Sequence, residues 1–253
     1  MLNTSYKNLM LFNLIFIELK KYKRTVLPWM IAAGGLLTSG TAIMIASTGN
    51  RRVSWETYTV QGFSFMNLLA LLLVAVFTGF VFTGESSHNI DNIIFTYPVS
   101  RIRFFLAKLI VILLYTILLY LAVLFFEILL GFLVIGSFPG WKIFLKMFEI
   151  SLILSAANYI LVPVTTFITI LVKGSGTYLF TGMAYFILYI SFTNTDINRY
   201  VPVCQPDKLL YGFFSPEIIS GSEIFAIITV CSVTFLSAFI ISVNSYTRQD
   251  VCN

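Results

Sequence analysis

The chain has 253 residues, of which 58% are hydrophobic and only 11% charged, and its mean hydropathy is +0.91. This composition excludes an ordinary water-soluble globule and indicates a protein with several membrane spans. The net charge of +5 does not indicate nucleic-acid binding, because the basic residues lie at the ends of apolar runs, where anionic lipid is the simpler partner.

Residues 1–26 predict a cytoplasmic helix that lies in the headgroup plane before the first span. Apolar side chains such as Phe12 and Phe16 are mixed there with charged ones such as Glu18 and Lys20. The segment lacks the charged-then-apolar order of a cleavable signal peptide, so we expect it to be retained. A simple basic membrane anchor explains the same residues equally well.

Continuous apolar runs follow, and each is near the roughly 20 residues that a membrane-spanning helix needs. The six runs are 27–47, 63–83, 108–135, 147–172, 177–193 and 224–243. They lack the alternating polarity of barrel strands. The predicted fold is therefore an all-α membrane protein, with six transmembrane helices preceded by an amphipathic interfacial helix, and with residues 27–253 forming one membrane domain.

Basic residues are unevenly divided between the two sides of these spans. Ten lie in the N-terminal arm, the second and fourth loops and the tail, whereas six lie on the other side. Because Lys and Arg beside a span resist translocation, both termini are predicted to face the cytoplasm. The loop 194–223, on the outer side, is rich in Pro, Gly and aromatic residues, and predicts either short amphipathic or re-entrant pieces or an ordinary loop with aromatic anchors.

One compact polar insert separates the second and third runs. It reads Gly-Glu-Ser-Ser-His-Asn-Ile-Asp-Asn-Ile-Ile-Phe-Thr-Tyr-Pro-Val-Ser-Arg-Ile-Arg over residues 84–103 and continues to Ala107 and Lys108. An acidic residue opens it, a short amphipathic segment follows, and Pro98 disfavours helix in the residue before it. Arg101, Arg103 and Lys108 are predicted to anchor the entry of the third span at the anionic leaflet.

This insert resembles the coupling loop of permease subunits of type-two ATP-binding-cassette (ABC) exporters. Among these, the chain is most similar to small permeases of peptide and antibiotic export, including lantibiotic immunity, bacitracin resistance and toxin-peptide secretion. The resemblance implies a bacterial plasma-membrane transport subunit without enzymatic activity of its own. It also implies two ABC ATPase subunits and a second permease copy or paralogue as partners, with a peptide or hydrophobic substrate.

The resemblance assigns the loop at about 84–107 to coupling with the ATPase, although a solvated amphipathic loop is the simpler structural alternative. Apolar side chains would enter a groove of the ATPase while polar ones fix the register. The predicted coupling residues are Glu85, His88, Ile90, Asp91, Ile93, Ile94 and Phe95. The chain carries no G-x-x-x-x-G-K-[ST] phosphate cradle, so ATP and Mg²⁺ are expected on the partner ATPase.

Polar residues within the spans are candidates for the translocation pathway, because such residues are costly in a bilayer. The candidates are Asn67, Glu127, Glu149, Ser155 and Asn158. Hydrogen bonding between helices at a dimer interface explains Asn67, Ser155 and Asn158 equally well. Glu127 lies 19 residues after Lys108, about 28 Å along a helix, so it could form an acidic outer mouth with Glu149. Pairing of both carboxylates with Lys142 and Lys146 is the alternative.

Two other function classes stay open at this stage. A secondary carrier or channel would need mid-membrane charges or paired broken helices, and Pro163 supplies only one break. An intramembrane enzyme would need catalytic side chains near the bilayer interior, and the single histidine, His88, lies in a loop. That single histidine also excludes a histidine-based metal cluster, so no metal site is predicted.

Overall fold

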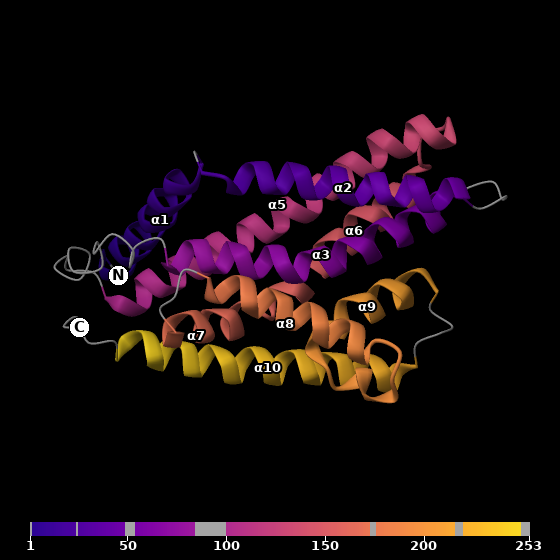
Figure 1. The fold of residues 1–253 in the computed structure, drawn as a ribbon. Coiled ribbons are helices and arrows are strands. Elements are labelled where there is room, and N and C mark those ends of the chain that lie inside the picture. The colour runs from indigo at the N-terminus through magenta and orange to yellow at the C-terminus, as the bar shows by residue number, and fades with distance from the viewer. Residues whose placement is uncertain are drawn as a thin grey trace.

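The computed structural model describes residues 2–23, 25–48, 54–83, 100–172, 176–215 and 220–248. Within these ranges all regular structure is helical. Most helices run along the long axis of an elongated bundle, and α1 lies obliquely at one end (Figure 1). The predicted all-α membrane fold is therefore confirmed.

The helix predicted before the first span is present as α1, Leu2–Tyr22. It packs against α5, Arg101–Ile135, and is followed by α2, Leu27–Thr48. The Tyr22 hydroxyl donates a hydrogen bond of 3.3 Å to the Val81 carbonyl oxygen, which ties the end of α1 to the bundle. The headgroup-plane position of α1 stays a prediction.

The centre of the bundle is formed by α3, Trp55–Thr83, and α5. Both sequences are almost continuously apolar, and large side chains such as Phe63, Phe77 and Leu119 are completely buried between the helices. Both helices begin before the apolar runs that predicted them, because a helix continues through a turn with polar side chains on one face. α5 has 35 residues and is about 52 Å long, more than the roughly 30 Å of a bilayer core.

The predicted kink near Pro163 is present as a break between α6, Trp141–Tyr159, and α7, Val162–Val172. Proline has no N–H group, so the helical hydrogen-bond ladder is interrupted there. The Ser242 hydroxyl of α10, Gly221–Thr247, donates a 2.7 Å hydrogen bond to the Pro163 carbonyl oxygen. A side chain of a neighbouring helix thus bonds to the backbone next to the break.

The described part of the segment between α8 and α10 forms short helical pieces. Two 3-10 turns, Asp196–Arg199 and Pro202–Cys204, lead into α9, Gln205–Phe214, which packs against α3 and α6. The Gln205 side-chain amide donates to backbone carbonyl oxygens of three preceding residues, at 2.8 to 3.2 Å. Of the two readings of this loop, the structure has the one with helical pieces.

The six-span count is not confirmed. Five stretches in the described part of the chain are long and apolar enough to cross a membrane: α2, α3, α5, the α6–α7 pair and α10. The fifth predicted run is α8, Thr177–Phe192, an apolar helix of only 16 residues. At 1.5 Å per residue it is about 24 Å long, which is shorter than a typical bilayer core.

Glycines set the closest approaches between helices. A Cβ atom built on Gly79 of α3 would lie 2.1 Å from Cγ of Tyr178 at the start of α8. Gly40 of α2, in contrast, has no atom within 4 Å of such a Cβ. The α3–α8 contact therefore depends on a missing side chain, as is common where membrane helices pack closely.

We predict that Gly79→Ala destabilises the protein by about 1–3 kcal/mol, because Tyr178 must move away from α3. Gly40→Ala is the matched control and should leave stability unchanged or raise it by up to about 1 kcal/mol through helix propensity. Thermal unfolding of the two purified variants in one detergent provides the measurement. Equal melting temperatures for both variants would contradict the packing argument.

Candidate functional site: a buried polar cluster

Asn67 is the centre of a hydrogen-bonded cluster inside the bundle. It lies in the middle of α3, is only 3% exposed and is surrounded in sequence by apolar residues. Its Nδ2 donates to Oδ1 of Asp207 at 2.8 Å. Its Oδ1 accepts from the Tyr120 hydroxyl at 2.7 Å and from Nδ2 of Asn158 at 3.3 Å. One side chain thereby connects α3 with α5, α6 and α9.

Asn158 lies at the end of α6, immediately before the break. Its Nδ2 donates to the Tyr120 hydroxyl oxygen at 2.7 Å and to the Leu154 carbonyl oxygen at 3.1 Å. Its Oδ1 is buried and has no hydrogen-bond partner among the described residues. Asn158 therefore keeps an unused acceptor inside the bundle.

Asp207 supplies the only carboxylate in this cluster. It lies in the first turn of α9, where the helix dipole favours a negative charge. The Tyr189 hydroxyl of α8 donates to its Oδ2, and Asn67 donates to its Oδ1. Burial raises the pKa of Asp207 above its ordinary value of 3.8, and these hydrogen bonds act in the opposite direction.

The cluster joins α9 to α3 and α8 through hydrogen bonds of Asp207. A polar group left without a partner in a low-dielectric interior costs about 1–3 kcal/mol, so these side chains hold one another in place. Every member except Tyr189, which is half-buried, is less than 9% exposed. In this conformation the cluster is closed, and a molecule could reach it only if the helices around it separated.

Among the predicted pathway residues, the structure brings Asn67 and Asn158 into contact. Ser155 lies one turn earlier on α6, but its hydroxyl donates to the Leu152 carbonyl oxygen of its own helix, at 2.8 Å. Ser155 is buried, but among the described residues it makes no hydrogen bond to the cluster. Two of the five predicted residues therefore share one site.

Glu127 and Glu149 do not form an acidic mouth in this conformation. Glu127 is fully buried, and a Cβ atom on Gly62 of α3 would lie 1.9 Å from its Oε1. Neither of its carboxylate oxygens has a hydrogen-bond partner in the described part of the chain. Glu149 is exposed. The alternative pairing is also absent, because no ion pair with Lys142 or Lys146 occurs among the described residues.

Sequence reasoning missed three members of the cluster: Tyr120, Tyr189 and Asp207. The two tyrosines gave no signal, because the chain has 13 tyrosines and most spans contain one. Asp207 gave a weak signal, as an acidic residue within an otherwise aromatic segment. Its contact with Asn67, which is 140 residues away in the chain, is set by tertiary packing alone.

The predicted anchors at the start of α5 behave differently from one another. The Arg101 guanidinium donates a 2.9 Å hydrogen bond to the Thr247 carbonyl oxygen at the end of α10, and Arg103 is partly buried. Lys108 is only 1% exposed, and its Nζ lies 5.2 Å from the ring centres of Phe82 and Phe104. The prediction that Lys108 contacts lipid headgroups is therefore wrong. Helix α5 begins seven residues earlier, which places Lys108 inside the bundle.

The predicted coupling residues, Glu85 to Phe95, lie outside the described residues. The helices on either side of them are described, however. α3 ends and α5 begins at the end of the bundle where the two chain termini also lie (Figure 1). The segment between them is therefore attached at that end.

Comparison with protein families identifies the chain. The model of the ABC-2 family transporter proteins matches residues 14–191, from within α1 to the end of α8. The chain belongs to the ABC-2 transporter family. A search of curated proteins found no match.

Membership makes this protein a multi-pass membrane permease component of an ABC-2 transporter. It is a transport subunit without a catalytic domain, and ABC-2 permeases generally pair with ABC ATPase subunits. The family match ends before α9 and α10. Asp207 therefore lies in the part of this ABC-2 permease that the match does not cover.

We predict that Asn67→Leu destabilises this ABC-2 permease by about 1–3 kcal/mol for each polar group that loses its partner. The affected groups are the Asp207 carboxylate and the Tyr120 hydroxyl. Thr116→Val is the control, since the buried Thr116 hydroxyl bonds only to a carbonyl of its own helix. Thermal unfolding in detergent should show a clearly lower melting temperature for Asn67→Leu. Similar losses in both variants would mean that the cluster adds no stability.

We also predict that Asp207 gives stability a pH dependence. Because its pKa is raised on folding, the folded state binds the proton more tightly than the unfolded state. Stability from this group is therefore greatest at low pH and falls as the pH rises above about 3.8 toward the raised pKa. Melting temperatures between pH 4 and 8 should decline less in Asp207→Asn than in the wild type. Parallel curves would disprove the assignment.

Proposed function

We propose that this chain is the permease subunit of an ATP-driven exporter that moves amphipathic peptides or hydrophobic antibiotics out of a bacterial cell. The observation that carries the proposal is the polar segment between α3 and α5 in a chain that belongs to the ABC-2 family. The resemblance to immunity and antibiotic-resistance permeases supports the substrate class. Transport by this class of protein is driven by ATP that is hydrolysed on a separate chain.

The proposed orientation places both termini in the cytoplasm. The larger share of basic residues lies on that side. The arrangement of the helices supports the same orientation. The predicted cytoplasmic segments adjoin the start of α1, the end of α3, the start of α5, the end of α7 and the end of α10, and these helix ends gather at one end of the bundle (Figure 1). The segment proposed for coupling then faces the cytoplasm, where an ATPase can bind it.

Two ATPase subunits would bind ATP and Mg²⁺ and contact residues 84–107 of each permease. Ile90, Ile93, Ile94 and Phe95 would enter the ATPase groove, and Asp91 would fix the register. Arg101 supports transmission of movement, because its hydrogen bond to Thr247 joins the start of α5 to the end of α10. A displacement of the loop would thereby reach two spans.

A second permease copy or paralogue would complete the pathway. The described faces of α8 and α10 support this proposal, because they carry exposed apolar side chains such as Phe180 and Phe225. Such faces suit lipid or another membrane helix. Asn67, Ser155 and Asn158 would line the pathway after α9 has moved away, and Glu127 and Glu149 would lie along the same route.

Co-purification with candidate ATPases from the same source tests the proposal. We expect the wild type to retain an ATPase, and Asp91→Lys and Ile93→Asn/Ile94→Asn to lose it. Glu149→Lys is the matched charge reversal, since Glu149 is exposed on α6 and away from the loop. Loss in all variants alike would overturn the coupling assignment. If no ATPase binds the wild type and transport persists without one, a secondary carrier becomes the better explanation.

A further inference from the structure

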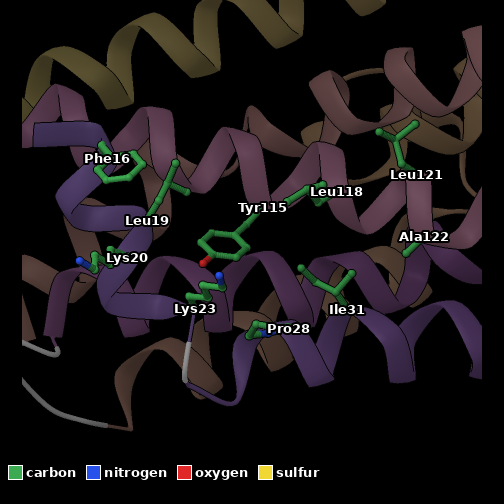
Figure 2. A pocket seen from close by; sticks show the side chains of 10 residues that line it. All are labelled: Phe16, Leu19, Lys20, Lys23, Pro28, Ile31, Tyr115, Leu118, Leu121 and Ala122. Carbon is green, nitrogen blue, oxygen red and sulfur yellow. The ribbon is translucent and has the colours of Figure 1, made fainter. Parts of the chain in front are cut away.

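A groove of about 1040 Å³ lies between α1, α2 and α5. Its wall contains side chains from all three helices, which are Phe16, Leu19, Lys20, Lys23, Pro28, Ile31, Tyr115, Leu118, Leu121 and Ala122. Figure 2 shows Lys23 with its nitrogen beside the Tyr115 hydroxyl, Lys20 farther out with its nitrogen directed away from that ring, and Leu118, Leu121 and Ala122 of α5 on the opposite side. The groove therefore has one cationic end and one apolar end.

The cationic end is formed by Lys20 and Lys23. Lys20 lies in the last turn of α1 and Lys23 directly follows the helix, with its backbone N–H still bonded to the Leu19 carbonyl oxygen at 3.2 Å, and both lysines are exposed. Neither forms an ion pair with a described residue. Their neighbour Lys21 differs, because its Nζ lies 2.6 Å from Oε1 of Glu18 and 5.6 Å from the Phe104 ring centre. Two positive charges thus remain available to a ligand.

The apolar end follows α5 along about two turns. From Tyr115 to Ala122 the helix rises by about 10 Å, and Leu118, which lies between them, is 50% exposed. The Tyr115 ring lies at the junction of the two ends, with its hydroxyl pointing toward Lys23 (Figure 2). A tyrosine in this position is typical of the membrane–water boundary, where its ring contacts hydrocarbon and its hydroxyl contacts polar groups.

We propose that this groove binds an anionic phospholipid of the surrounding bilayer. The phosphate contacts Lys20 and Lys23, the Tyr115 hydroxyl donates to a headgroup or glycerol oxygen, and one acyl chain lies along Leu118 and Ala122. Charge complementarity selects this occupant. A soluble anion would leave the apolar wall unused, and a neutral lipid would leave the two lysines unpaired.

The bound lipid would hold α1 against the bundle. The chain turns from α1 into α2 next to the lysines, and α1 packs directly on α5. A lipid that contacts all three helices fills the space between them and opposes the separation of α1. The binding reaction involves no transport step, so it is independent of the proposed export function.

Native mass spectrometry of the whole purified chain in detergent tests the proposal. Phosphatidylglycerol and phosphatidylcholine with identical acyl chains are compared as ligands. Because two lysines contact the phosphate, we expect the wild type to bind phosphatidylglycerol at least about tenfold more tightly than phosphatidylcholine. Lys20→Gln/Lys23→Gln should lose that preference. Lys142→Gln/Lys146→Gln is the matched control, because both lysines are exposed at the start of α6, and it should keep the preference.

A second variant tests the apolar end without removing charge. Leu118→Gln changes a half-exposed residue, so we expect it to fold and to bind both lipids several-fold more weakly, with the preference for phosphatidylglycerol retained. Equal binding of the two lipids by the wild type would overturn the proposal. An equal loss of the lipid preference in the Lys20/Lys23 and Lys142/Lys146 double variants would also overturn the proposal, since that result indicates attraction by the overall charge of the protein. If the Lys20→Gln/Lys23→Gln variant does not fold, the Lys20→Arg/Lys23→Arg variant takes its place, and it must keep the preference for phosphatidylglycerol.

Discussion

The hydrogen bonds of Asn67 are the interaction on which the arrangement of this bundle most depends. A bilayer offers no water to a polar side chain, so a buried amide must find its partners within the protein. Asn67 finds them on α5, α6 and α9 at once. The apolar contacts around it favour burial but tolerate sliding and rotation, whereas hydrogen bonds require fixed distances and angles. The cluster therefore specifies which helix faces meet, and it fixes α9 on the spans.

Close helix packing provides the second constraint. Within a membrane the hydrophobic effect does little to bring spans together, so packing contacts and small residues decide the interfaces. Gly79 allows the Tyr178 side chain to lie against α3, and Gly62 leaves room for the buried carboxyl group of Glu127. The break before Pro163 ends α6 one residue after Asn158, and Ser242 of α10 bonds to the Pro163 carbonyl oxygen beside the break. The glycine contacts, the helix break and the hydrogen bonds of Asn67 thus all favour the same packing of the helices.

These constraints connect the two ends of the protein in a way that suits an ABC-2 permease. At the end that carries the chain termini, Arg101 joins α5 to α10, and Lys108 is buried against aromatic rings. Toward the other end, α9 is held through Asp207 by Tyr189 of α8 and by Asn67 in the middle of α3. Helix α5 takes part in both sets of contacts, through Arg101 at its start and through the hydrogen bond of Tyr120 to Asn67. A rigid helix about 52 Å long can transmit a displacement from one end to the other.

The sequence by itself determined the helical membrane fold, the helix before the first span, the break near Pro163 and the polar character of Asn67 and Asn158. These properties are local, because hydropathy, helix length and the missing N–H of proline act within one segment. Only the tertiary structure decided that the two asparagines meet, that Tyr120, Tyr189 and Asp207 join them, that Lys108 and Glu127 are buried and that Glu149 is exposed. Such outcomes depend on how far each helix extends and which face it turns toward its neighbours. Hydrogen bonds between residues far apart in the chain, such as Asn67 and Asp207 at 140 positions, set those faces, and the periodicity within a single helix does not predict them.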